Sequence, residues 1–310
     1  MAAILVEHLS KTFHPSWPWQ QPVHALTDVS LIVGEGEVFG FLGHNGAGKT
    51  TMMKILLGLM RPSGGRAEIL GKPAGDVSTH ACVGYLPESP YFYDYLTAYE
   101  FLYFYGRLGQ LTLSHLRARV PELLELVGLA SAAHRPLRKF SKGMLQRVGL
   151  AQALIHDPEL VILDEPMSGL DPIGRKEVRD IILGLREEGK TVFFSTHIIP
   201  DIEIICDRVG ILVGGTLRAQ GRVEDLVRHD AEDSFDVVVT GLVGDSVPTL
   251  KPLALRIVQQ GKQCLMAFPS RCNLEEVLSH VRRAGGAVVS VTPHKRSLED
   301  IFLERTSQVN

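Results

Sequence analysis

The 310-residue sequence has no apolar run close to the roughly 18–20 residues that a membrane-spanning helix needs. Residues 1–10 also lack the basic start and the following apolar stretch of a secretory signal peptide. We therefore expect a chain that stays in the cytoplasm. If it works at a membrane, another subunit must supply the helices that cross the bilayer.

Cysteine is scarce, and positive charge is not in excess. The four cysteines lie far apart and form no C-x-x-C pair, which argues against a metal or disulfide framework and favours isolated thiols in a reducing compartment. Lys and Arg total 32 against 35 Asp and Glu, so the formal net charge is −3. Nucleic-acid-binding proteins usually carry a basic excess. We therefore expect no nucleic-acid partner.

Strand-like and helical segments alternate through most of the chain, and this order predicts an α/β fold with a largely parallel sheet. Between the sheet strands, residues 95–160 show helical spacing of apolar residues and predict a helical subdomain over about residues 89–160. A polar break at 230–233 divides a first domain, 1–230, from a small α+β domain, 231–310. We predict strands at 3–13, 23–33, 37–42, 83–86, 160–163, 192–195, 209–213, 216–219, 235–239, 255–259, 264–267 and 287–291, and helices at 48–60, 99–108, 114–127, 142–155, 172–188, 223–228, 273–284 and 297–304.

A glycine-rich loop follows the third predicted strand and precedes a predicted helix. Residues 43–50, GHNGAGKT, match the phosphate-loop pattern G-x-x-x-x-G-K-[ST] in full. Glycines let successive backbone N–H groups turn around a phosphate, and the helix N-terminus adds partial positive charge. Lys49 would bring a full charge to the β- and γ-phosphates, and the Thr50 hydroxyl would ligate Mg²⁺.

Two acids, Asp164 and Glu165, end the apolar strand predicted at 160–163. The carboxyl ends of parallel strands are where ligands bind in open α/β sheets. We expect Asp164 to hold Mg²⁺, through water. Glu165 points to the other side of the strand, so we expect it to face the γ-phosphate and to polarise an attacking water as general base.

The stretch Phe140–Arg147, FSKGMLQR, narrows the choice among nucleotide hydrolases. It resembles the LSGGQ-x-x-R signature of the ATP-binding-cassette (ABC) family, and its SKGM variant resembles the class of exporters often called type 2. Ser168–Asp171 looks like the D-loop of that family, and His197 looks like its switch histidine. The resemblance covers about residues 3–228, and the tail SLEDIFL at 297–303 is similar to the closing motif of many type-2 exporter ATPases.

The resemblance implies the ABC ATPase fold with a helical subdomain and an ATP-hydrolysing subunit of a transporter. It implies two copies, or paired subunits, that enclose ATP and Mg²⁺ at their interface, with the signature of one completing the site of the other, beside a polytopic membrane permease at the inner face of the cell membrane. Glu165 and His197 would be catalytic. Thr50, Asp164 and Glu88 would hold the metal. The residues that would bind nucleotide are Phe13, Gly43, His44, Asn45, Gly46, Ala47, Gly48, Lys49, Thr50, Thr51, Glu88, Ser141, Gly143 and Asp171.

One position departs from the family pattern, and for another function of the family more than one residue is a candidate. Glu88 stands where the family's Q-loop usually has glutamine; it can still reach Mg²⁺ or a water, but it adds negative charge. Phe13 is the best positional match for the aromatic residue that stacks on adenine, with Trp17 and Trp19 as competitors and core packing as the alternative.

The aromatic cluster at 91–95 also has two interpretations: core of the helical subdomain, or a groove that grips a short helix of the membrane partner.

For the whole chain we expect an exporter motor. An importer subunit and a soluble ABC ATPase acting on ribosomes or DNA are the alternatives. The single phosphate loop and the lack of a long charged linker argue against the soluble one.

Overall fold

The computed structural model describes residues 2–14, 17, 19, 21–229, 234–241, 253–260, 263–269, 272–294, 298, 299, 301 and 302. Its internal contacts divide the chain into two compact units, with the boundary between Val223 and Glu224. The polar break expected at 230–233 lies outside the described residues. In the described part of the chain, no helix is both long and apolar enough to cross a membrane.

A six-stranded sheet forms the centre of the first unit, and all of its strands are parallel except β10. The four residues of β7 are all apolar and buried, as expected for a strand covered on both faces. The carboxyl ends of β3, β7 and β8 meet at one edge of the sheet. In the order β10-β9-β3-β8-β7-β6, the strands are Thr216–Arg222, Arg208–Val213, Val38–Leu42, Thr191–Thr196, Leu160–Leu163 and Val83–Leu86.

The first two strands of the chain do not join this sheet. They belong to a separate antiparallel sheet with the order β2-β1-β4-β5, made of Val23–Gly34, Ala2–Phe13, Gly64–Ile69 and Lys72–Pro73. One buried cluster contains side chains from both sheets and from α1, Lys49–Leu56. The prediction of a helix to residue 60 was wrong, because Gly58 has a φ of 70° and lies so close to Gly75 that a Cβ on it would be 2.3 Å from the Gly75 Cα.

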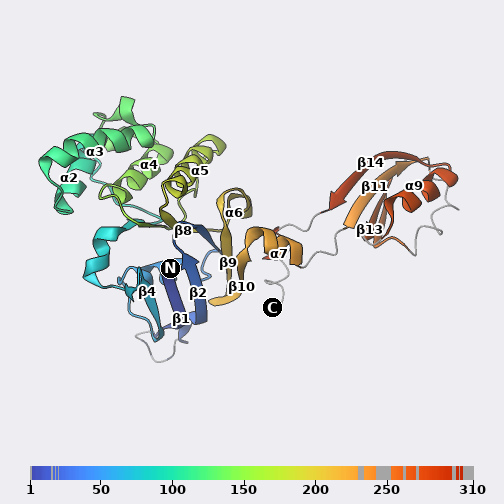
Figure 1. Cartoon of the computed structure of the whole chain (residues 1–310), viewed down its shortest axis with the longest axis horizontal. Coiled ribbons are helices and arrows are strands. Elements are labelled where there is room, and N and C mark those ends of the chain that lie inside the picture. The colour runs from blue at the N-terminus through green and yellow to red at the C-terminus, as the bar shows by residue number, and fades with distance from the viewer. Residues whose placement is uncertain are drawn as a thin grey trace. The chain divides into compact units, whose positions relative to one another are not determined.

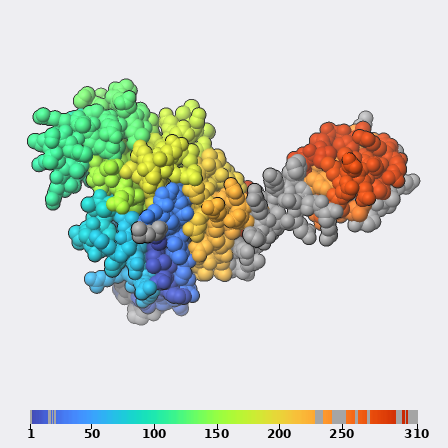
Figure 2. All heavy atoms as spheres, in the orientation of Figure 1, coloured from blue at the N-terminus to red at the C-terminus, as the bar shows by residue number. Residues whose placement is uncertain are grey.

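The helical subdomain contains α2, α3 and α4, which group together beside α5 in Figure 1 and form the green part of the surface in Figure 2. Threonine, serine or aspartate caps the start of each of these four helices, and the first cap is a complete capping box between Thr97 and Glu100. The helices are Ala98–Leu108, Leu113–Leu126, Lys142–Ala153 and Pro172–Glu187.

Several short elements were not predicted. Helix α6, Ile199–Ile205, has seven residues, too few to show a helical period. Short 3₁₀ helices cover Val77–Cys82, Ala130–Ala132 and Leu137–Lys139. Helix α7, Val223–His229, was in contrast predicted, at residues 223–228, and it begins at the boundary of the two units.

The second unit is a four-stranded antiparallel sheet with helix α9, Leu274–Arg283. Val237, Met266 and Phe268 from the sheet and Val277 and Val281 from the helix form its buried core. Of the helix predicted at 297–304, four described residues are helical, and Leu298 and Ile301 are buried. The strands, in the order β12-β13-β11-β14, are Arg256–Gln260, Gln263–Pro269, Ser234–Thr240 and Ala287–His294. The expected α/β class is confirmed.

Candidate nucleotide-binding site

A cavity of about 350 Å³ lies where the glycine-rich loop leaves β3. Eight of its eleven lining residues are ones that the sequence analysis selected. The other three begin β2 and were missed, because nothing in the sequence shows that this strand crosses the loop. The lining residues are Val23, His24, Ala25, Asn45, Gly46, Gly48, Lys49, Thr50, Thr51, Glu88 and Glu165.

The backbone of the loop needs glycine at two points. Gly46 has a φ of 82° and Gly48 a φ of 109°, in the region that L side chains rarely adopt. A Cβ on Gly48 would also lie 2.3 Å from the carbonyl oxygen of Ala25. Behind the loop, Gly215 in the β9–β10 turn donates its N–H to Ala47 at 3.0 Å, while its own carbonyl accepts from Thr27 at 2.8 Å. The loop is therefore held from outside before any phosphate arrives.

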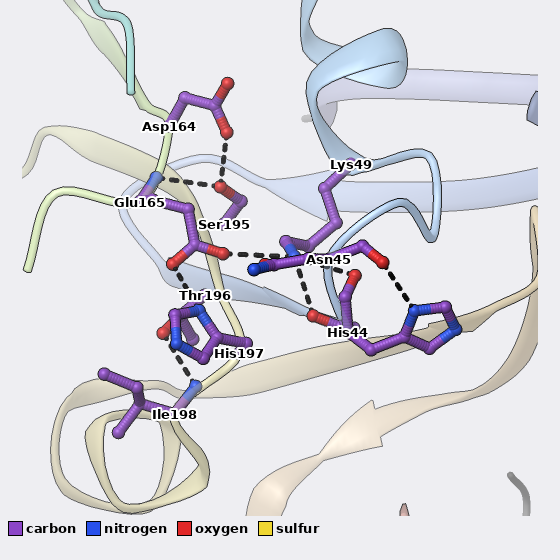
Figure 3. Close-up of polar contacts among 10 residues, drawn as sticks. His44, Asn45, Lys49, Asp164, Glu165, Ser195, Thr196, His197 and Ile198 are labelled. Atoms are coloured by element: carbon purple, nitrogen blue, oxygen red, sulfur yellow. Dashed lines mark hydrogen bonds and ion pairs between the residues drawn. The ribbon is translucent and has the colours of Figure 1, made fainter. Parts of the chain in front are cut away.

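Lys49 is almost fully buried and points back into the loop (Figure 3). Its Nζ donates to the carbonyl oxygens of Gly43, at 2.6 Å, and His44, at 3.2 Å. The same Nζ lies 3.1 Å from Oε1 of Glu165, and both side chains are 6% exposed. The ammonium group is thus paired with the carboxylate that we expected to be the base.

The backbone of Glu165 is held in an unusual conformation. Its φ is 50°, which costs a non-glycine residue about 1–3 kcal/mol and persists only where neighbours enforce it. Here the Glu165 N–H donates to Ser195 Oγ at 2.9 Å, and Ser195 Oγ donates to Asp164 Oδ1 at 2.7 Å. Figure 3 shows the two acidic side chains pointing apart. Ser195 was not among the predicted site residues, although a serine directly after the apolar residues Val192–Phe194 was a visible signal.

His197 is the second partner of the Glu165 carboxylate, opposite Lys49. Its Nδ1 lies 2.9 Å from Oε2 of Glu165, and its ring is 41% exposed. The carboxylate of Glu165 therefore lies between an ammonium group and an imidazole, one on each oxygen (Figure 3). Such a carboxylate can change partners when a phosphate enters the cavity.

The residues around Asp164 fit a magnesium ion. Its Oδ2 is buried and has no hydrogen-bond partner among the described residues. Thr50 and Glu88 line the adjoining cavity and offer further oxygen ligands. In the described part of the chain, no three His, Cys, Asp or Glu side chains cluster tightly enough to hold a metal alone. Mg²⁺ usually binds through one or two carboxylates, waters and substrate phosphates, and the free oxygen of Asp164 beside the cavity is a ligand of that kind.

The signature and D-loop residues do not line the cavity of their own chain. Ser141 is the exposed N-cap of α4, and its Oγ accepts from the N–H of Met144 at 3.3 Å. Gly143 lies in the first turn of the same helix. Asp171 is the exposed N-cap of α5, where Oδ1 accepts from Gly174 at 2.8 Å. Neither helix start therefore contributes a group to the cavity of its own chain.

The structure also separates the aromatic candidates from the cavity. Phe13 is 40% exposed, with Lys11 Nζ 5.2 Å from its ring centroid, and it does not line the cavity. Its cross-strand partner Val23 does line it. Trp17 and Trp19 stack on one another at 5.2 Å between ring centroids and are exposed.

The chain is similar over most of its length to proteins of one family. The family model "ABC transporter" matches residues 26–168. An ABC transporter ATP-binding protein from Synechocystis sp. is 53% identical over 96% of this chain and 82% of its own length. The chain belongs to the ABC transporter ATP-binding proteins. The Nod factor export ATP-binding protein I of Cupriavidus pinatubonensis is 34% identical over 91% of this chain and 86% of its own length.

Solved structures of ABC cassettes share the fold. The ATP-binding subunit of an ABC transporter superposes with a TM-score of 0.63 at 32% identity, covering 73% of this chain and 92% of that one. A dimeric ATP-binding cassette with ADP and phosphate superposes with a TM-score of 0.64 at 25% identity, covering 71% and 98%. The ABC ATPase fold is therefore confirmed, and the chain is an ABC-family ATPase that binds nucleotide.

Proposed function

We propose that this ABC ATPase is the motor of an exporter, in which two copies close over two ATP molecules and drive a separate membrane protein. The observation that carries the ATP-hydrolysing part of this proposal is the placement of Glu165 between Lys49 and His197 at the edge of the cavity. The relative named for Nod factor export favours export over import. The SKGM form of the signature supports the same direction.

The proposed reaction uses the exchange of partners at Lys49. The γ-phosphate of ATP gives the ammonium group a new anionic partner, which releases Oε1 of Glu165. That oxygen accepts a proton from a water whose oxygen attacks the γ-phosphorus, while the bond from phosphorus to the ADP oxygen breaks. His197 keeps its contact with Oε2 and holds the carboxylate in place. Such a base contributes about 10²–10⁴-fold.

Thr50, Asp164 and Glu88 would hold Mg²⁺, which when bound neutralises charge on the phosphate oxygens. The unpaired Oδ2 of Asp164 supports this assignment. Ser195 fixes the other oxygen, Oδ1, so the free oxygen has one defined direction. The glycine loop, from Gly43 to Gly48, and Thr51 would bind the phosphates through backbone and side-chain donors.

The second copy would supply what the cavity lacks. Ser141 and Gly143 are at the N-terminus of a twelve-residue helix, which favours an anion. Because they do not reach the cavity of their own chain, a neighbouring cassette is the natural source of these donors. The dimeric cassette with ADP and phosphate, which this chain resembles, supports an arrangement of two copies.

The aromatic residues after Glu88 would contact the membrane subunit. Phe92 packs on buried Phe101, with 5.3 Å between ring centroids, and therefore belongs to the core of the helical subdomain. Tyr91 and Tyr95 are 79% and 66% exposed. Phe92 thus fits the interpretation as core packing, and we assign the other interpretation, contact with a partner helix, to Tyr91 and Tyr95 because they are exposed.

Purification of the tagged chain from detergent-solubilised membranes tests this function. We expect a polytopic membrane protein to accompany it and to be lost with the double change Tyr91→Ala and Tyr95→Ala, while phosphate release from ATP remains. The matched control is Val77→Ala, which removes an equally exposed apolar side chain elsewhere. Recovery of ribosomes or DNA in place of a membrane protein would support the soluble alternative. Uptake in place of efflux by the reconstituted pair would support the importer.

A further inference from the structure

One buried carboxylate near the site has no role in the reaction described so far. Asp201 lies in the first turn of α6, and its side chain is 2% exposed. Burial raises the pKa of Asp201, and the nearby charges of Arg179 and Arg175 oppose that rise. A buried carboxylate is costly unless it is paired, so its presence here calls for a specific partner.

That partner is on the neighbouring helix. Nη1 of Arg179, on α5, lies 3.4 Å from Oδ1 of Asp201, and Oδ2 has no hydrogen-bond partner among the described residues. One turn earlier on α5, Arg175 Nε donates to the carbonyl oxygen of Leu170 at 3.2 Å. The same face of α5 therefore holds both α6 and the segment 168–171 that precedes α5.

Helix α6 depends on this pair because its start lacks the usual support. The N-cap residue is Ile198, which has no side-chain oxygen to accept the free N–H groups of the first turn. Apart from Asp201, the buried residues of α6 are Ile202 and Ile205, whose apolar packing holds the helix against the protein but forms no hydrogen bond that would orient it. The ion pair between Asp201 and Arg179 sets the orientation of the helix.

The residue just before this helix start is the switch histidine. His197 comes four residues before Asp201, and its Nδ1 must stay within hydrogen-bonding distance of Glu165. We propose that Asp201 and Arg179 are a positioning pair, which sets α6 so that His197 holds Glu165 and which links that contact to the segment 168–171. This proposal rests on the proposed catalytic roles of Glu165 and His197.

Purified full-length protein with Mg²⁺–ATP provides the test. We expect Asp201→Asn and Arg179→Met each to lower kcat about 10- to 100-fold, as for a small misplacement of a reacting group, with KM for ATP within about twofold. The double variant should be no slower than the slower single variant. Asp201→Glu should recover part of kcat, since it keeps the charge.

A second comparison separates positioning from simple stability. In the Asp201→Asn background, His197→Ala should cause little further loss, because the histidine is already displaced. The control Glu37→Gln breaks another partly buried ion pair, with Arg208 at 3.1 Å, and should change the melting temperature without changing kcat.

The outcomes distinguish the positioning role of Asp201 and Arg179 from the ATPase function on which it rests. Wild-type kcat for Asp201→Asn, or losses that add with those of His197→Ala, would overturn the positioning role and leave the ATPase intact. Absence of ATP hydrolysis by the wild-type chain, alone and with its membrane partner, would instead overturn the proposed function on which this inference rests.

Discussion

Replacing Glu165 by Gln should separate ATP hydrolysis from ATP binding. The change keeps the size of the side chain and removes the group that accepts the proton. Hydrolysis should therefore fall by about 10²–10⁴-fold, the usual contribution of a positioned base. The affinity for ATP should move in the opposite direction.

The reason is the buried ion pair with Lys49. At 3.1 Å, its Coulomb energy is about 5 kcal/mol for an effective dielectric constant of 20. Desolvation offsets much of this in the wild type, but removing one partner leaves a buried charge uncompensated, at a cost of about 3–5 kcal/mol. A bound phosphate removes that cost. Since 1.4 kcal/mol is a factor of ten, the variant should bind ATP at least about tenfold more tightly than the wild type.

Isothermal titration calorimetry with Mg²⁺–ATP measures the affinity, and phosphate release measures turnover. His197→Ala is the matched control, because it removes the contact at Oε2 and leaves Lys49 paired. It should slow hydrolysis without tightening ATP binding. An unchanged Kd in Glu165→Gln, or near-normal turnover, would refute the exchange of partners.

Three further changes test other parts of the molecule. Lys49→Ala should weaken ATP binding itself, because the loop loses its one ammonium group; unchanged affinity by calorimetry would contradict this. Ser141→Arg should stop turnover but leave the Kd for ATP unchanged. Mixing it with Lys49→Ala protein should restore some activity, since one hybrid site is intact, and full activity of Ser141→Arg alone would rule out the two-copy site. Gly84→Ala should lower the free energy of unfolding by about 1–3 kcal/mol in urea titration, because its Cβ would lie 2.2 Å from the carbonyl oxygen of Ala153. Gly184→Ala, which meets open space, is the control, and equal stability of the two variants would show that the contact relaxes freely.

Elements with a strong period or a defined start were predictable from the sequence. Strand β7 was predicted to the residue, and α4 and α5 were predicted from the correct first residue, directly after the capping residues Ser141 and Asp171. The phosphate loop at 43–50 and the acids Asp164 and Glu165 were found because each motif is a short, continuous stretch of sequence.

Features that depend on long-range contacts were not predictable. The start of β2 lines the cavity only because that strand pairs with β1 in a second sheet. The ion pair between Lys49 and Glu165 joins residues more than a hundred positions apart, and no spacing rule predicts it. Helix α6 was missed because seven residues with a proline near the start show no period.

The turn at Gly214 and Gly215 has a consequence for how this chain can vary in length. Gly215 donates its N–H to Ala47 in the phosphate loop and accepts at its carbonyl from Thr27 in β2, so its position is tied to both the loop and that strand. An extra residue in this hairpin would move Gly215 away from Ala47 and Thr27, break these hydrogen bonds and weaken phosphate binding by the loop. The connection between β1 and β2 at residues 14–22 has no such tie to Ala47 among its described residues, so length differences between related chains should accumulate there and not in the hairpin.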